Sequence, residues 1–220
     1  SAPVAARQAS IAAALVEQGR AAITEHSPTR VQQGVAQLQE ATALDPGSAR
    51  AWGALALGYG ALYFRTPPED QPALVARAEA AIARALELEP AQADALSARA
   101  AMTPAYGNWL AREAIEKDTI RRTGGQGGNY PRFLLGVGRA SDALGLAERR
   151  SPVALYPQVG RANALFAAGR IDEADRATAE LIRLWPQNYL AWFTRIYFLM
   201  YTGRAEEAAE MAADRSGWPL

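Results

Sequence analysis

The chain has few residues that could carry out catalysis or hold a metal ion. His26 is its one histidine, and cysteine is absent. A transition-metal site needs several nitrogen or sulfur ligands, so a single imidazole cannot build one. His26 stands where a first helix should end, and a cation at that place interacts favourably with the unpaired backbone carbonyls. No nucleophile elbow or other catalytic constellation is found, so we expect neither an enzyme nor a cofactor.

A second candidate site is a glycine-rich stretch that follows two arginines. It reads Arg121-Arg122-Thr123-Gly124-Gly125-Gln126-Gly127-Gly128. Backbone amides in such a turn can bind an anion, and two guanidinium groups can clamp it. The stretch lacks the Gly-Lys-Ser/Thr end of a P-loop and follows a predicted helix, whereas the dinucleotide fingerprint follows a strand. Two hypotheses stay open, a flexible linker and an anion site at Arg121 and Arg122.

The charge balance argues against binding to nucleic acid or to a membrane surface. Basic and acidic residues number 23 each, so the formal net charge is zero at pH 7. Without a basic stripe this segment should not bind nucleic acid, and no apolar run is long enough for membrane insertion. The start at Ser1 lacks the pattern of a signal peptide, and we expect the chain to be part of a longer polypeptide. The compartment stays open between bacterial cytoplasm and periplasm.

Repeated sequence patterns indicate the framework that positions these residues. Gly169-Arg170-Ile171-Asp172-Glu173-Ala174 recurs 34 residues later as Gly203-Arg204-Ala205-Glu206-Glu207-Ala208. In a second pattern a proline precedes a tryptophan by six residues, as Pro46 and Trp52 and again as Pro186 and Trp192. A period of 34 with glycine in a turn and alanine in the following helix is typical of stacked two-helix units.

On these residues the chain resembles the tetratricopeptide repeat (TPR) family over most of its length. The resemblance implies an all-α, right-handed α-solenoid of about six antiparallel helix pairs, which form a single repeat domain over residues 1–220. The predicted repeats cover residues 3–47, 48–91, 92–123, 124–154, 155–188 and 189–214, with a Gly-rich break at 123–129.

Two repeats depart from the family pattern. About ten residues are inserted into the second repeat, around residues 64–70, where we expect a turn-rich extension between its helices. In the third repeat the family pattern for the second helix is matched by Trp109, Ala111 and Ile115, which we expect to pack against the array. Asp118, however, stands where the pattern has a packed alanine. Four glycines within residues 124–128 are incompatible with a stable helix, so the array should be interrupted there.

Three arginines share one register position that is normally apolar in the family. Arg99, Arg161 and Arg195 fall at position 7 of the first helix in repeats three, five and six. In one hypothesis each stem packs while its head pairs with an acid on a neighbouring helix. Glu173, Glu180 and Glu207 are the candidate acids. In the other hypothesis the arginines line a groove for acidic ligands.

The resemblance also implies a partner-binding surface. In the family the first helices line a concave groove that binds peptides, and aromatic residues are favoured at such surfaces. The alternative is that these side chains pack against another repeat, a partner chain or a missing part of the protein. The predicted groove residues are Tyr156, Asn163, Phe166, Phe193, Tyr197, Met200 and Tyr201.

We therefore expect a protein–protein interaction scaffold with a protein or peptide in its groove. Arrays of this style resemble those in CadC-like transcriptional regulators, where they follow a winged-helix domain. That implies a sensory or regulatory module of a larger bacterial signalling or transcription-regulator protein. The alternatives are a stand-alone TPR adaptor or an enzyme with an unrecognised site. Because the last repeat lacks a polar capping helix, Trp218 should fold back over it or the chain should form a homodimer through that end.

Overall fold

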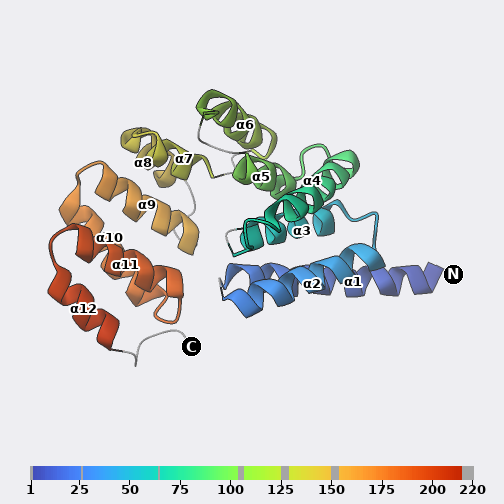
Figure 1. Cartoon of the computed structure of the whole chain (residues 1–220), viewed down its shortest axis with the longest axis horizontal. Helices are drawn as coiled ribbons and strands as arrows, with labels where there is room; N and C mark the ends of the chain where they lie inside the picture. Colours follow the sequence, from blue (N-terminus) through green and yellow to red (C-terminus); the bar gives the residue numbers. More distant parts are fainter. Residues whose placement is uncertain are drawn as a thin grey trace. The chain divides into compact units, whose positions relative to one another are not determined.

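A computed structural model describes residues 2–25, 27–63, 65–103, 107–124, 129–149 and 154–214. These residues form twelve helices and no strand, which confirms the predicted all-α fold (Figure 1). The chain divides into two compact units, Ser1–Asn129 and Tyr130–Leu220, and the division falls at the end of the Gly-rich stretch. His26 and Gly125–Gly128 lie outside the described residues.

The first unit consists of helix pairs that stack in chain order. They are α1 (Ala2–Thr24) with α2 (Pro28–Leu44), α3 (Ala49–Tyr63) with α4 (Gln71–Leu88), and α5 (Ala93–Met102) with α6 (Trp109–Arg122). Each helix packs against the next, and the first helices of successive pairs also touch, α1 with α3 and α3 with α5. This nearest-neighbour packing is that of a helical repeat array. Residues 65–70 form the turn-rich connection predicted between α3 and α4.

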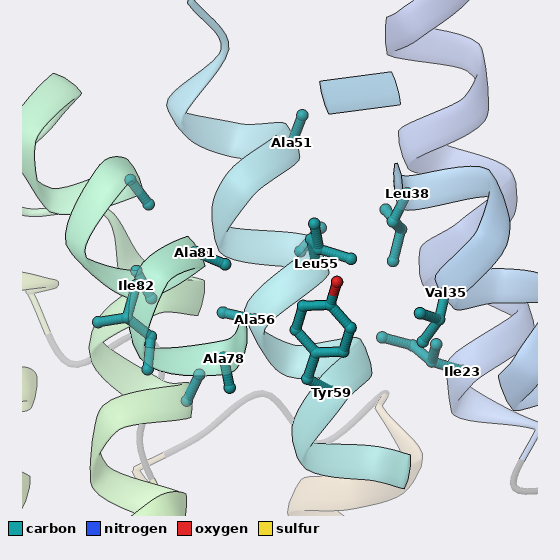
Figure 2. Packing of buried hydrophobic residues seen from close by; sticks show 14 of the residues in the cluster. Ile23, Val35, Leu38, Ala51, Leu55, Ala56, Tyr59, Ala78, Ala81 and Ile82 are labelled. Atoms are coloured by element: carbon teal, nitrogen blue, oxygen red, sulfur yellow. The ribbon is translucent and has the colours of Figure 1, made fainter. Parts of the chain in front are cut away.

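The core of the first unit is built from aliphatic side chains and alanines. Figure 2 shows Leu55 and Tyr59 of α3 between Leu38 of α2 and Ile82 of α4. The Tyr59 hydroxyl still finds a polar partner, because it accepts a hydrogen bond from Gln39 Nε2 at 3.1 Å. Burial of this apolar surface is what holds consecutive helix pairs together.

The first two helices cross at a pair of glycines. A Cβ added to Gly34 would lie 2.8 Å from the backbone oxygen of Gly19 and 2.9 Å from Ile23 Cγ2. A Cβ added to Gly19 would lie 2.6 Å from Leu38 Cγ. Because the close-packed core leaves the helices no room to move apart, only glycine fits at this crossing.

The second unit has the same kind of stacking. It consists of α7 (Tyr130–Gly136) with α8 (Ala140–Glu148), α9 (Leu155–Ala167) with α10 (Ile171–Leu184), and α11 (Tyr189–Tyr201) with α12 (Ala205–Ala213). Its first helices touch in sequence, α7 with α9 and α9 with α11. Side chains of α9 and α11 can therefore share one surface, as the TPR register requires.

Three turns in the second unit share one geometry, and it explains the recurring Gly-Arg pattern. Gly138, Gly169 and Gly203 all have a positive φ, between 75° and 79°, that L-residues rarely adopt. The amide of the following arginine donates to a carbonyl five residues back, which closes the Schellman motif of a helix end. The same arginine then pairs with an acid three residues later, in the pairs Arg139–Asp142, Arg170–Glu173 and Arg204–Glu207.

Replacing Gly203 by alanine should lower the free energy of unfolding by about 1–2 kcal/mol, because its positive φ forces the new Cβ toward the neighbouring carbonyl. Gly145 is the matched control, since it lies inside α8 with open space around it. Gly145→Ala should raise the free energy of unfolding by about 0.5–1 kcal/mol. Urea denaturation followed by circular dichroism measures both, and effects of equal sign would contradict the assigned turn.

The second sequence pattern, proline followed by tryptophan, forms a repeated hydrogen bond. Trp52 Nε1 donates to the Pro46 carbonyl at 3.0 Å, and Trp192 Nε1 donates to the Pro186 carbonyl at 2.7 Å. Trp192 is buried, with 8% of its surface exposed, and Trp52 is half-buried against the core of the first unit. Each indole thus connects, by one hydrogen bond, its own helix to the turn that precedes that helix.

The packing expected for α6 was wrong. Trp109 and Ala111 were expected to pack against the array, yet Trp109 is 38% exposed, Ala111 is exposed and Ile115 is only half-buried. The helix turns a polar face to the interior, where its buried residues are Arg112, Glu116 and Thr119. The reason is that backbone groups at the end of α5 and at Asn129 face this side of α6 and supply hydrogen-bond partners to its polar side chains.

Those groups form a closed hydrogen-bond network around one buried carboxylate. Glu116 Oε1 accepts from Arg112 Nε at 3.1 Å and from Arg112 Nη2 at 2.9 Å. Its Oε2 accepts from the Asn129 amide at 2.9 Å. Arg112 Nη1 donates to the Thr103 carbonyl at 2.8 Å. The ion pair therefore joins the end of α5 and the end of the first unit to α6.

Candidate functional site

An aromatic ladder runs along α11. It consists of Tyr189, Phe193, Tyr197 and Tyr201, which recur every four residues and so lie on one face of the helix. Their ring centroids are separated in turn by 5.8, 4.5 and 5.4 Å. Between 40% and 67% of each residue's surface is exposed. The ladder is thus a continuous row of contacting rings that spans α11 and is open to solvent.

A pocket of about 160 Å³ lies beside the ladder, among α9, α10 and α11. Phe166 of α9 packs edge-on against Phe198 at 5.8 Å and lies 6.5 Å from the Tyr201 ring. The residues that give the pocket its character are Asn163, Phe166, Thr178, Thr194, Tyr197 and Tyr201. The pocket therefore has aromatic walls with a few hydroxyl and amide groups.

Charged groups next to the pocket are paired with one another. Arg195 Nη1 donates to Asp175 Oδ1 and to Thr178 Oγ1, the latter at 2.9 Å. Arg204 Nη1 donates to the same Asp175 oxygen at 2.7 Å. The Arg195 guanidinium also lies 5.6 Å from the centre of the Phe198 ring. The network holds α10, α11 and the turn before α12 in register.

This network decides between the two hypotheses for two of the three position-7 arginines. Arg195 pairs with Asp175 on α10, and Arg99 pairs with Asp118 on α6, so both heads reach an acid on a neighbouring helix. The acids that pair directly with Arg99 and Arg195 were not among the candidates named from the sequence, although Glu207 interacts electrostatically with Arg195. Arg161 lies elsewhere, in a second pocket of about 320 Å³ that Glu173 and Glu180 also line.

The second unit should lose stability on acidification. Burial alone would raise the pKa of Asp175, but hydrogen bonds from Arg195 and Arg204 together hold that pKa below its ordinary value of 3.8. The hydrogen bond from Arg204 likewise lowers the pKa of Glu207. A carboxyl whose folded pKa is lowered contributes stability that is fully present above its unfolded pKa and is lost as pH falls through the folded pKa.

We therefore expect hydrogen exchange in α10–α12 to be slow at pH 7 and, after correction for the intrinsic rate, to accelerate steadily below about pH 4. The variant Arg204→Gln removes the partner that Asp175 and Glu207 share. It should flatten this pH dependence. An identical pH profile in wild type and variant would mean that these ion pairs do not stabilise the unit.

The seven predicted groove residues are distributed over the ladder, the pocket and their surroundings. Four of them line the pocket, namely Asn163, Phe166, Tyr197 and Tyr201. Phe193 lies within the ladder. Met200 is 56% exposed on α11, and Tyr156 is 48% exposed at the start of α9. Partial burial raises the pKa of the Tyr156 phenol above its ordinary value. These two residues do not line the pocket.

Sequence reasoning missed Tyr189, the first ring of the ladder. The family register places it at position 1, outside the set that lines the groove. Its spacing of four residues from Phe193 was the available signal, because residues four apart meet on a helix surface. The polar groups of the pocket, Thr178 and Thr194, were also missed.

The candidate anion site has a competing partner for its arginines. Asp118 pairs with Arg121 Nη2 and with Arg122 Nε, the second at 2.9 Å, as well as with Arg99. The hydrogen bond from Arg121 is the largest cause of the lowered pKa of Asp118. An anion at Arg121 and Arg122 would have to displace this carboxylate. Three of the four glycines that were to cradle it, Gly125, Gly127 and Gly128, lie outside the described residues, so the site stays a prediction.

The described residues offer neither a metal site nor a membrane-spanning helix. No cluster of three or more metal-ligating side chains occurs among them. None of their helices combines the length and apolar character needed to span a bilayer.

The helix pairs, their nearest-neighbour stacking and the shared turn geometry define a TPR-like helical repeat fold. The same fold occurs in pilF of Pseudomonas aeruginosa, a TPR protein whose solved structure was reported in a functional characterisation. That structure matches with a TM-score of 0.52 at 16% sequence identity, and the match covers 93% of this chain and 90% of pilF. At this identity the likeness establishes the fold. No family model and no curated protein matches the chain.

Proposed function

We propose that the protein is a protein–protein interaction scaffold and that its second unit binds a peptide segment of a partner along the ladder and the adjoining pocket. The observation that carries the proposal is the row of four contacting aromatic rings exposed on α11. Exposed apolar surface costs free energy in water, so a contiguous patch of this kind marks an interaction site. Aromatic anchors provide large contact area at small entropic cost.

The polar groups of the site support a peptide as the ligand. Tyr197 and Tyr201 present hydroxyls beside the rings, and Asn163 adds a side-chain amide. These groups can hydrogen-bond peptide carbonyls and amides while the rings cover the apolar part of the chain. The site therefore combines a few polar contacts with a mainly apolar surface, as peptide-binding grooves do.

Replacing Phe193 and Tyr197 together by alanine should weaken partner binding at least tenfold, since aromatic anchors contribute about 1–2 kcal/mol or more each. Affinity capture from the source cell, quantified for wild type and double variant, measures the effect. Leu110→Ala is the control, because Leu110 is an apolar residue of the first unit that is 85% exposed. If wild type and double variant capture the same proteins in equal amounts, the ladder is not a binding site.

The wider role that the CadC-like resemblance implies is a second proposal. The protein would then be the sensory or regulatory module of a larger bacterial signalling or transcription-regulator protein. The alternative is a stand-alone adaptor in the periplasm or cytoplasm. The gene sequence upstream of Ser1 separates them. A helix-turn-helix domain there supports the regulator, whereas an export signal there supports the periplasmic adaptor.

A homodimer through the C-terminal end also stays a proposal. The expected fold-back of Trp218 lies outside the described residues. Sedimentation velocity of the wild type and the Phe193→Ala, Tyr197→Ala variant tests whether the ladder joins two copies. A dimer that dissociates in the variant would assign the ladder to self-association.

A further inference from the structure

The pocket of about 320 Å³ between α9 and α10 is a second concave site of the second unit, and we call it the arginine pocket. Its volume lies within the range of clefts that hold small molecules. It shares no lining residue with the pocket of about 160 Å³ beside the ladder. The side chains that give it its character are those of Arg161, Glu173, Arg176, Glu180, Leu184 and Trp185. Charged and apolar groups therefore meet in a hollow that the proposed peptide site does not use.

The two carboxylates of the arginine pocket are already engaged by arginines beside it. Glu173 accepts hydrogen bonds from Arg170 Nε at 2.7 Å and from Arg170 Nη2 at 2.6 Å. Glu180 accepts hydrogen bonds from Arg183 Nε, at 2.8 Å, and from Arg183 Nη2. Each guanidinium fork thus uses both oxygens of one carboxylate, which is a strong geometry for such a pair.

The two arginines that line the pocket have no acid of their own. Within the described part of the chain neither Arg161 nor Arg176 forms a hydrogen bond or an ion pair. The hydrogen bond from Arg170 is the largest cause of the lowered pKa of Glu173, and the two pocket arginines add only a longer-range attraction. Arg161 is half-buried, and a cation withdrawn from water without a counter-ion costs free energy. This pair of guanidinium groups therefore favours the entry of an anion.

Exchange of partners among these side chains does not remove the excess of positive charge. Glu148 of α8 also acts on Arg170 and is the third acid beside these arginines. The acids are Glu148, Glu173 and Glu180, and the arginines are Arg161, Arg170, Arg176 and Arg183. Four cations against three anions leave at least one guanidinium without a carboxylate in every pairing. The arginine pocket is therefore electrostatically complementary to an anionic ligand.

Another part of the pocket wall is apolar. Leu184 is 42% exposed, although it lies on the same helix as the buried Leu181. Trp185 is half-buried and packs against the core of the second unit. A small hydrated ion would leave this wall in contact with water, whereas a ligand with an apolar body would cover it. The pocket therefore fits an anionic group that is joined to an apolar group.

We propose that the arginine pocket binds a small organic anion, a carboxylate or phosphate attached to an apolar group, through Arg161 and Arg176. Guanidinium forks match the oxygens of both anions, and the apolar group covers Leu184 and Trp185. Arg161 belongs to α9 and Arg176 to α10, so the bound anion bridges two packed helices. The inference goes beyond the proposed peptide-binding function, because no residue of the ladder takes part in this site.

The test is a nuclear magnetic resonance titration of the indole N–H signals of the full chain with four probes. Phenylacetate and phenyl phosphate carry an anion and a ring, phenylacetamide carries the ring without the charge, and inorganic phosphate carries the charge without the ring. We expect at least one of the two aromatic anions to bind about tenfold more tightly than phenylacetamide and than inorganic phosphate. The tighter of the two identifies the oxyanion. The Trp185 signal should shift, and that of Trp52 in the first unit should not.

Substitutions of the arginines test the place of binding and the absence of a structural partner. Arg161→Gln and Arg176→Gln should each weaken binding of the aromatic anion about tenfold, because each removes a charged donor. Arg77→Gln is the matched control, since Arg77 is an exposed arginine of α4 in the first unit. Because Arg161 has no acid of its own, Arg161→Gln should also leave the urea midpoint of unfolding unchanged or raise it.

Four outcomes would overturn the inference, and all of them leave the peptide-binding proposal for the ladder untouched. Aromatic anions that bind no better than phenylacetamide, or not at all at millimolar concentration, would show that the charge is not recognised. Inorganic phosphate that binds as tightly as the aromatic anions would remove the role of the apolar wall. Binding that survives both arginine substitutions would place the anion elsewhere. A lower urea midpoint of Arg161→Gln would assign that arginine to an ion pair with the acids of the pocket.

Discussion

Replacing Glu116 by alanine is expected to lower the free energy of unfolding of the first unit by about 3–5 kcal/mol. Glu116 is fully buried and Arg112 is 9% exposed. Removal of the carboxylate leaves the guanidinium buried without its counter-ion and leaves the Asn129 amide without an acceptor. The cost is therefore the desolvation of the remaining groups as well as the loss of the pair. Urea denaturation monitored by hydrogen exchange in α5 and α6 measures it.

Two controls separate this mechanism from a general effect of losing a charge. Glu87→Ala breaks an exposed pair with Arg84 and should change stability by less than about 1 kcal/mol. Arg112→Met combined with Glu116→Leu removes both buried charges and should recover much of the loss, since apolar replacements of a buried pair are often neutral. A Glu116→Ala effect no larger than that of Glu87→Ala would contradict the buried network.

Trp192→Ala should destabilise the second unit by about 3–5 kcal/mol, the cost of removing a large buried aromatic side chain. The indole is 8% exposed and joins the body of α11 to the turn at Pro186. Its removal leaves a cavity at the start of α11 and frees the Pro186 carbonyl. Loss of this anchor should also loosen the helix that carries the ladder.

Trp192→Phe distinguishes packing from hydrogen bonding at the same position. Phenylalanine retains most of the buried ring but cannot donate to Pro186, so the expected loss is about 1–2 kcal/mol. Hydrogen exchange at the start of α11 and urea denaturation give both quantities. If Trp192→Ala costs no more than Trp192→Phe, the indole does not pack as described.

The turns could be predicted from the sequence because their geometry is decided by a few neighbouring residues. Three residues suffice to end one helix and start the next: a glycine at positive φ, the arginine that follows it, and an acid three residues after the arginine. Gly203, Arg204 and Glu207 are an example. The interval from Pro186 to Trp192 is likewise closed by one local hydrogen bond. These local patterns set the period of the repeats, and the period indicates the fold.

The face that α6 buries could not be predicted in the same way. Arg112 and Glu116 are acceptable inside because Thr103 and Asn129 supply their remaining partners. Those partners lie outside the helix, in positions that only the folded chain brings together. For the same reason the sequence did not identify Asp175 as the acid that Arg195 and Arg204 share.

The candidate site was predictable to the extent that it follows helical periodicity. The family register led to Phe193, Tyr197 and Tyr201, whose spacing places them on one face of α11. The pocket depends on the approach of α9 to α11, which brings Phe166 to the Tyr201 ring. Distances between helices are not encoded in any short pattern, so its polar groups were not foreseen.

The central claim is that the ladder on α11 is covered by a peptide segment of a partner in the cell. The most direct measurement is site-specific photo-crosslinking from a benzoyl-phenylalanine placed at Tyr197, with the same residue at Leu110 as the control. We predict adducts from position 197 that map by mass spectrometry to one peptide segment of a partner and are absent from position 110. Adducts of equal yield and identity from both positions, or none from position 197, would contradict the claim.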